Sequence, residues 1–479
     1  MKLGQTSFVV FVSRFGGSVL GFFATLYIAR TLGSAVFGTY TVVIALIFWL
    51  ELLGSMGLSN ATTKRISEGR DQSAYFTAGM ISIAALGTVV ISGLILVADM
   101  VNAYVGESVV GFVILLLVVR LFYSFVDATL SGERLVHIGG IAQAAKIGTR
   151  SAAQIGLVLA GGSLSSLLIG YAAGGASVGV ASLRYISLHL RRPTVEHFAR
   201  LVEYAKFSWL SQLETRSFNE VDVLVLNAFV SPSLVGVYAV AWNISKFLTI
   251  FGNSISATLF PEMSKLSAEE DIGAVTKLLE DGLAYSGLVL LPGLVGGVVL
   301  SERLLRIYGD EYVQGSTVLG LLILACLLYG YQNQLLAALN AIDRPDLAFR
   351  TNGLFIASNV ALNVILVWRY GWVGAAAATV LATGIGLSMS VVLLSRVIDV
   401  SPPLREIGRE VLSALVMGGA LTVLGWMRLP ETGTYGIAVT VGLVGVGAGV
   451  YFVTLVALSS QFRKTIVDNL PFDSFPPVR

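Results

Sequence analysis

Lys146 and Arg150 are the residues of this sequence whose types and spacing most clearly point to chemistry. They are four residues apart, so they share one face of a helix, where like charges repel. The surrounding apolar segment, 138–160, contains no acidic residue, and a charge inside a membrane is costly. A phosphate or pyrophosphate between the two cations would relieve this cost by accepting several charge-assisted hydrogen bonds. A long helix that leaves both side chains hydrated at the cytoplasmic surface would also explain them.

Other charged residues occur in similar apolar segments. Arg120 and Asp127 are two turns apart in one segment, so a local pairing between them is an alternative to a functional role. We expect the buried cations to bind an anionic substrate and the buried acids to couple an ion or to pair charges. The candidate substrate-binding residues are Arg14, Arg120, Lys146, Arg150, Arg216 and Lys246, and the candidate acids are Glu51, Asp127 and Asp222.

The composition predicts a membrane protein built from helices. Of the 479 residues, 55% are hydrophobic and only 13% are charged, against about 25% charged in soluble domains. About 20 apolar residues cross a bilayer as a helix. We therefore predict an all-α fold of about fourteen spans near 7–29, 36–58, 75–98, 108–130, 138–160, 164–188, 204–230, 234–260, 280–300, 315–338, 349–368, 372–396, 408–427 and 435–458.

The basic residues predict the orientation of these spans. With the N-terminus inside, the cytoplasmic segments hold 18 Lys and Arg residues and the outer segments hold 5. Positive charge accumulates on the cytoplasmic side of membrane proteins. We therefore expect a multi-pass protein of the cell membrane whose N- and C-termini are both cytoplasmic.

Weak internal similarity suggests that the chain contains two repeats. LGSAVFGTYTVV (32–43) is similar to VSPSLVGVYAVA (230–241), with Gly38 on Gly236 and Tyr40 on Tyr238. Each expected repeat has six spans, so both enter the membrane from the same side and the repeats are parallel. We predict an N-terminal lobe (1–190), a C-terminal lobe (191–400), two extra spans (401–460) and a cytoplasmic tail (461–479).

Several of these segments resemble the polysaccharide-biosynthesis flippases of the multidrug/oligosaccharidyl-lipid/polysaccharide exporter superfamily. The resemblance includes Ala29, Arg30, Leu32, Gly33, Phe37, Gly38 and Tyr40, then Asp222 in VDVLVLN, then VGVYAVA (235–241) and LFPEMSKL (259–266). It implies two six-helix lobes around a central cavity. It also implies alternating-access transport of a polyprenyl (dolichyl or undecaprenyl) phosphate- or pyrophosphate-linked saccharide from the cytoplasmic to the outer leaflet.

Two other functions remain as alternatives at this stage. A multidrug or small-molecule cation antiporter of the same fold would have a cavity rich in acids and aromatic residues. A membrane-embedded glycosyltransferase would need catalytic acids and usually a large outer domain, whereas the longest outer loop, near 301–314, has about 14 residues. The sequence contains no Walker motif or nucleophile constellation. We therefore expect a monomeric transporter with lipid partners and without enzymatic activity, catalytic residues, cofactor, metal or nucleic-acid partner.

Overall fold

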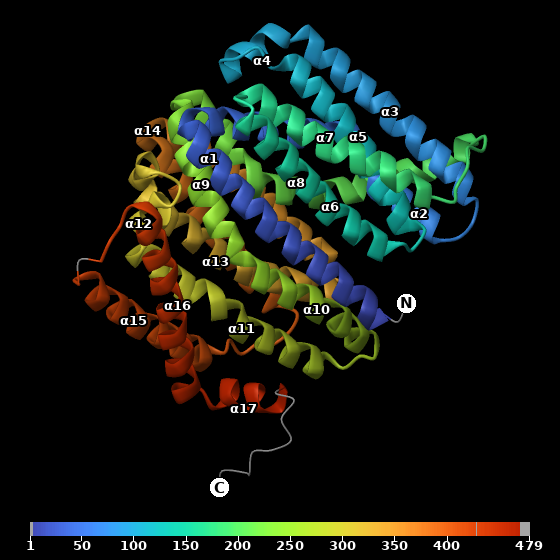
Figure 1. The fold of residues 1–479 in the computed structure, drawn as a ribbon. Coiled ribbons are helices and arrows are strands. Elements are labelled where there is room, and N and C mark those ends of the chain that lie inside the picture. The colour runs from blue at the N-terminus through green and yellow to red at the C-terminus, as the bar shows by residue number, and fades with distance from the viewer. Residues whose placement is uncertain (1–2, 428, 470–479) are drawn as a thin grey trace. The chain divides into compact units, whose positions relative to one another are not determined.

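The computed structural model describes residues 3–427 and 429–469, except the side chains of residues 3–12, 14, 15, 207, 210, 211, 434 and 465–469. Within these ranges the regular structure consists of helices, without strands (Figure 1). The all-α fold predicted from the sequence is therefore confirmed.

The helices form two compact units. Unit 1 comprises Met1–Val240 and Phe355–Thr379, and unit 2 comprises Ala241–Leu354 and Val380–Arg479. Two helices, α9 (Pro232–Phe247) and α14 (Pro345–Leu394), contribute residues to both units. The other helices of unit 1 are α1 (Leu3–Ser55), α2 (Leu58–Ser67), α3 (Gln72–Leu96), α4 (Ala98–Val105), α5 (Val110–Gly132), α6 (Val136–Leu159), α7 (Leu164–Ser182), the 3-10 helix η1 (Leu183–Tyr185) and α8 (Val195–Phe229).

Unit 2 contains the C-terminal helices. α15 lies beside both α11 and α16, and α11 also lies beside α13. The expected tail is helical as far as Asn469, and residues 470–479 lie outside the described ranges. The helices of unit 2 are α10 (Thr249–Ala268), α11 (Ile272–Val299), α12 (Ser301–Arg306), the 3-10 helix η2 (Asp310–Gly315), α13 (Ser316–Ala341), α15 (Leu404–Gly425), α16 (Gly433–Leu458) and α17 (Ser460–Asn469).

The expected spans fall on these helices, but in two places a single helix runs through two consecutive spans. α1 covers both 7–29 and 36–58 and is interrupted at Gly33, whose φ of 80° is left-handed. α14 covers 349–368 and 372–396 and is interrupted at Gly371, with φ of 61°. Glycine adopts such angles without the steric cost that a Cβ brings. The two breaks therefore separate the spans without a polar loop.

The number of spans stays a prediction. Nine helices of the described residues are long and apolar enough to cross a membrane, and the bent pair α9 and α10 makes ten. α6 and α8 do not pass this test, because polar and charged side chains lower their hydropathy. These are the two helices that contain Lys146, Arg150, Arg216 and Asp222.

The structure differs from the predicted continuous helix over 234–260. α9 and α10 are bent by 44° at Leu248. The Thr249 hydroxyl donates to the Lys246 carbonyl oxygen at 2.8 Å, a side-chain bond that competes with the helical ladder and bends helices. The expected outer loop near 301–314 also contains structure, because α12 and η2 occupy most of it.

The two repeat segments identified in the sequence pack directly against each other. A Cβ on Gly38 would lie 1.9 Å from the Pro232 carbonyl oxygen, and a Cβ on Gly236 would lie 2.0 Å from the Ser34 carbonyl oxygen. The Ser34 and Ser233 hydroxyls are 2.5 Å apart. The contact is reciprocal, because Ser34 aligns with Pro232 in the repeat. Such reciprocity is typical of elements related by a two-fold axis.

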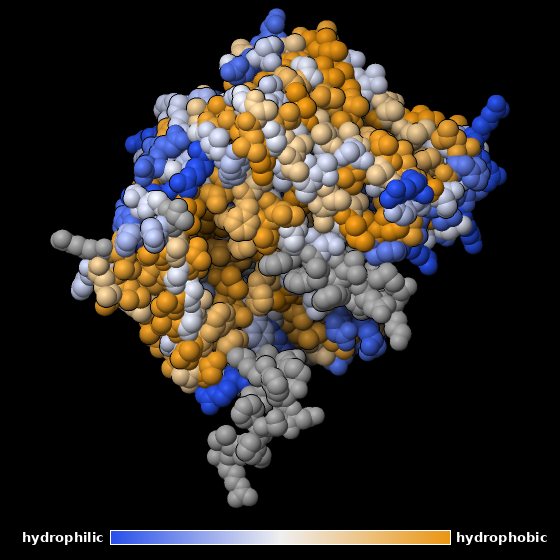
Figure 2. Space-filling view, in the orientation of Figure 1, coloured by the Kyte–Doolittle hydropathy of each residue, from blue (hydrophilic) through white to orange (hydrophobic). Residues whose placement is uncertain are grey.

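Apolar side chains cover much of the surface. Large hydrophobic residues such as Val89 and Leu96 on α3 and Val453 on α16 are more than two-thirds exposed. Figure 2 shows hydrophobic residues over most of the visible face and hydrophilic residues gathered near helix ends. An apolar exterior of this extent fits a lipid environment.

We predict that Gly38→Ala and Gly236→Ala each destabilise the protein, since the added methyl group would overlap a backbone oxygen that cannot move aside. The apparent melting temperature in detergent should fall by several degrees. Gly156→Ala is the matched control, because nothing lies within 4 Å of its Cβ position on α6. Equal melting temperatures for all three variants would contradict this account of the repeat contact.

Candidate functional site

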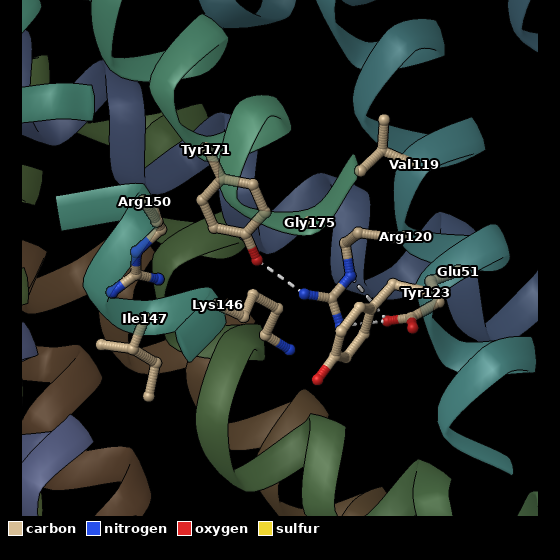
Figure 3. A pocket seen from close by; sticks show the side chains of 9 residues that line it. All are labelled: Glu51, Val119, Arg120, Tyr123, Lys146, Ile147, Arg150, Tyr171 and Gly175. Carbon is tan, nitrogen blue, oxygen red and sulfur yellow. Dashed lines mark hydrogen bonds and ion pairs between the residues drawn. The ribbon is translucent and has the colours of Figure 1, made fainter. Parts of the chain in front are cut away.

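A shared carboxylate joins three helices of unit 1. Glu51 on α1 is 7% exposed. Its Oε2 accepts hydrogen bonds from Arg120 Nε on α5 at 2.9 Å and from Arg216 Nη2 on α8 at 3.2 Å. Arg120 Nη1 also donates to the Tyr171 hydroxyl of α7 at 2.6 Å (Figure 3). Arg120 thus pairs with another helix, as a buried charge must when water is absent.

Phe48 supports the same two arginines. It precedes Glu51 by three residues, so its ring and the carboxylate share a face of α1. The ring centroid is 4.2 Å from Arg120 Cζ and 4.4 Å from Arg216 Cζ. Cations are attracted to aromatic faces. One ring and one carboxylate therefore hold two guanidinium groups that would otherwise repel each other.

Lys146 and Arg150 on α6 have a different environment. Lys146 Nζ is 3.8 Å from the centroid of the Tyr123 ring, and Arg150 Cζ is 5.5 Å from that of Tyr171. Among the described side chains, no carboxylate forms an ion pair with either cation. The Arg150 Nε atom is buried and has no hydrogen-bond partner among them. These two cations are therefore half-buried against aromatic rings, without an ion-pair partner among the described residues.

Glycines on the neighbouring helices allow α6 to pack closely. A Cβ on Gly174 of α7 would lie 2.7 Å from Arg150 Cβ, and one on Gly17 of α1 would lie 3.2 Å from Ile147 Cδ1. Small residues let membrane helices approach in this way. Close packing against α7 and α1 therefore determines the direction in which the face of α6 with Lys146 and Arg150 points.

These side chains line one cavity. It has a volume of about 40 Å³, which is enough for ordered water. Three of the lining side chains are basic, Arg120, Lys146 and Arg150, and one, Glu51, is acidic. The balance of charge along the lining therefore favours an anion. The lining residues are Glu51, Val119, Arg120, Tyr123, Lys146, Ile147, Arg150, Tyr171 and Gly175.

Asp222 on α8 forms a second polar site in unit 1. It is 3% exposed, and its carboxylate accepts hydrogen bonds from Asn363 Nδ2 at 2.8 Å and Thr379 Oγ1 at 2.6 Å, both on α14. The Tyr238 hydroxyl of α9 also donates to it. Three uncharged donors thus surround a carboxylate. The Asn363 Oδ1 atom nearby is buried and has no partner in the described part of the chain.

The remaining candidates are Lys246, Arg14 and Asp127. Lys246 belongs to unit 2, where its Nζ lies 5.9 Å from the centroid of the Trp242 ring. Arg14 lies within α1, and its side chain is outside the described residues. Asp127 is near Lys146, and its Oδ1 lies 3.3 Å from the Cβ position of Gly139.

Sequence reasoning did not identify the aromatic and hydroxyl partners of these sites. Phe48, Tyr123, Tyr171 and Thr379 were not distinguishable from other residues of apolar spans. Their roles depend on which helix faces which, and a single sequence does not contain that information. Asn363 belongs to a polar stripe with Asn359 at four-residue spacing, and this stripe was the one available signal.

Comparison with known proteins agrees with this fold. A family model described as polysaccharide biosynthesis protein matches residues 27–316, more than half of the chain. The chain is 29% identical over 471 residues to the probable flippase AglR of Haloferax volcanii. The match covers 97% of this chain and 98% of that protein.

Solved structures show the same fold. The lipid II flippase MurJ, in an inward closed conformation, aligns with a TM-score of 0.79 at 16% identity, covering 96% of this chain and 100% of that one. A multidrug resistance MATE family transporter of the MOP superfamily, in an inward-facing conformation, aligns with a TM-score of 0.66 at 14% identity, covering 80% and 95%. The resemblance drawn from the sequence motifs is therefore confirmed: the chain belongs to the polysaccharide biosynthesis protein family and has the fold of these solved flippase and MOP-superfamily transporter structures.

Proposed function

We propose that this protein moves a polyprenyl phosphate- or pyrophosphate-linked saccharide from the cytoplasmic to the outer leaflet of the cell membrane by alternating access. Both termini lie in the cytoplasm, as the distribution of basic residues predicts. Relatives named as a probable flippase and as a probable glycan biosynthesis flippase support transport for glycan biosynthesis. The name of the structural neighbour, a lipid II flippase, supports a lipid-linked substrate.

The observation that carries this proposal is the pair of cations on α6. Lys146 and Arg150 lack a carboxylate partner among the described residues, although Arg120 and Arg216 beside them share Glu51. An anionic ligand would supply the missing charge, and the bare Nε of Arg150 would donate to a phosphate oxygen. The polyprenyl chain would stay in the lipid, and α15 and α16 offer an apolar surface to it.

The volume of the cavity bears on the mechanism. The cavity of about 40 Å³ would have to widen before the saccharide of a lipid-linked headgroup could enter beside Lys146 and Arg150. Separation of α6 from α5 and α7 would open the site, and their closure would remove water from the bound headgroup. Such opening and closing is the expected behaviour of an alternating-access transporter. Arg14, on the α1 segment that packs against α6, is the further cation that we assign to the headgroup.

The acids have separate roles in this mechanism. Glu51 pairs charges, because two guanidinium groups share its Oε2 atom. Asp222 has only neutral donors around it, so it retains a negative charge that a coupling cation could neutralise. Its carboxylate, the bare Asn363 Oδ1 and the Thr379 hydroxyl are oxygen ligands of the kind that hard cations prefer. The cationic cavity disfavours the alternative of a cation antiporter.

We predict that Lys146→Ala and Arg150→Ala each reduce transport about tenfold or more, since each removes a charge-assisted contact of about 1.5–3 kcal/mol. The measurement uses proteoliposomes that contain a fluorescent polyprenyl phosphate-linked sugar, with a membrane-impermeant quencher to report the occupied leaflet. Arg184→Ala is the control, because Arg184 is exposed beside Tyr185. Transport equal to that of the control in both variants would refute the assigned role.

Glu51→Gln should lower the apparent melting temperature markedly, because removing one partner of a buried ion pair costs about 3 kcal/mol or more. Adding Arg216→Gln should restore part of the lost melting temperature. Without the carboxylate the two guanidinium groups repel each other, and this second substitution removes one of them. An unchanged melting temperature for Glu51→Gln would show that the shared carboxylate does not stabilise unit 1.

Asp222→Asn should abolish the stimulation of transport by an imposed sodium or proton gradient, while leaving slow exchange without a gradient. The amide retains the shape of the side chain and removes its charge. Asp99→Asn, on the exposed first turn of α4, is the control. Full gradient dependence in Asp222→Asn would exclude Asp222 as the coupling residue.

A further inference from the structure

An unpaired acid is buried in unit 2, away from the residues considered so far. Glu410 lies in the second turn of α15 and is 3% exposed. Its Oε2 atom is buried and has no hydrogen-bond partner among the described residues. No ion pair of the described chain includes Glu410. A carboxylate left in this condition would be costly, because neither water nor a cation compensates its charge.

Two tyrosine hydroxyl groups face the same place and are also without partners. Tyr331 on α13 and Tyr451 on α16 both have buried, unbonded hydroxyl oxygens, and Tyr451 is fully buried. A Cβ on Gly287 of α11 would lie 2.5 Å from Glu410 Oε2 and 2.7 Å from the Tyr331 hydroxyl oxygen. The carboxyl and the hydroxyl thus converge on one point beside Gly287. Tyr451 lies within electrostatic range of both.

Glu406, one turn earlier on α15, is by contrast a paired acid. It accepts hydrogen bonds from Arg409 Nη1 and from the Ser459 hydroxyl, the latter at 2.6 Å. Arg409 is therefore already engaged with Glu406. The negative charge of Glu406 acts on Glu410 and makes a second ionised carboxylate there still less favourable.

We infer that Glu410 is a proton-binding site, occupied in this state by a proton on its Oε2 atom. The neutral acid carries no uncompensated charge, and the hydroxyl groups of the two tyrosines lie near it without being hydrogen-bonded to it in this structure. The proton would come from water near the first turn of α15, about 9 Å along the helix axis, at the end expected to be cytoplasmic. Release of this proton would change the charge of a membrane segment by one unit. A proton gradient can perform work through such a change in charge.

The set of ligands favours a proton over a metal cation. One carboxyl group and two tyrosine oxygens converge here, whereas hard cations take six or more oxygen ligands. Leu288, next to Gly287, and Ala414, one turn after Glu410, belong with Tyr451 to one buried apolar cluster. The titratable and charged groups on the helices packed around Glu410 are Glu406 and Arg409 on α15, Tyr331 on α13, Tyr451 on α16, and Tyr285, Glu280 and Asp281 on α11.

Infrared difference spectroscopy of the full chain in nanodiscs, as the pH is raised, tests this inference without any transport assay. We expect the wild-type protein to lose a band of a protonated carboxyl group. Glu410→Gln should lack this band, and Glu406→Gln, the matched control one turn away, should keep it. The same band amplitude in Glu410→Gln and the wild type would overturn the assignment.

Two further measurements keep the test decisive. If Glu410→Gln does not fold, Tyr331→Phe and Tyr451→Phe replace it, and at least one should shift the band by removing a polar hydroxyl group from the surroundings of the acid. Unshifted bands in both would overturn the inference. Loss of the band on adding NaCl at constant pH, with no loss on adding choline chloride, would also overturn it, because the site would then take sodium. The result does not depend on the proposed substrate or on Asp222.

Discussion

The cost of an uncompensated charge between membrane helices organises unit 1. Glu51 compensates the positive charges of both Arg120 and Arg216. It thereby connects α1, α5 and α8 through a single oxygen atom. Phe48 lies on the same face of α1 and supports both guanidinium groups. Because this carboxylate is already committed, it does not neutralise the neighbouring α6. Among the described residues that line this cavity, the cations left without an ion pair are therefore Lys146 and Arg150.

Three buried acids show three answers to the same physical problem. Glu51 has cationic partners, and Asp222 has three neutral hydrogen-bond donors. Glu410 has neither, although two tyrosine hydroxyls lie close to it. Partners of these kinds favour, in turn, a charge held in an ion pair, an anion open to a cation, and a neutral acid. The environment, rather than the residue type, distinguishes their roles.

Close helix packing makes these environments possible. The reciprocal contact of Gly38 and Gly236 joins the two repeat segments through their backbones, without space for a side chain. Gly174 similarly lets α7 approach α6 at Arg150, and Gly287 lets Glu410 and Tyr331 converge. Lipid does not drive helices together as water does, so backbone approach and polar pairing contribute much of the association. Glycine thus positions the polar groups on which the function depends.

The sequence by itself determined the helical membrane fold, the repeat at Gly38 and Gly236, the family and the unusual character of α6. These properties follow from hydropathy, from motifs and from the spacing of Lys146 and Arg150, all of which are local. It also identified Glu51, Arg120, Arg216 and Asp222 as buried charges, since a charge in an apolar span is visible without coordinates.

The tertiary structure alone decided which charges meet. Arg120 is bonded to Glu51, 69 residues away, and Asp222 is held by Thr379, 157 residues away. Glu410 did not stand out in the sequence, because it lies near Arg409 and Glu406 at the edge of a span. Glu410 is left without a cation because Arg409 is hydrogen-bonded to Glu406. Pairing depends on the rotation and depth of several helices at once, and neither is encoded in the periodicity of any one of them.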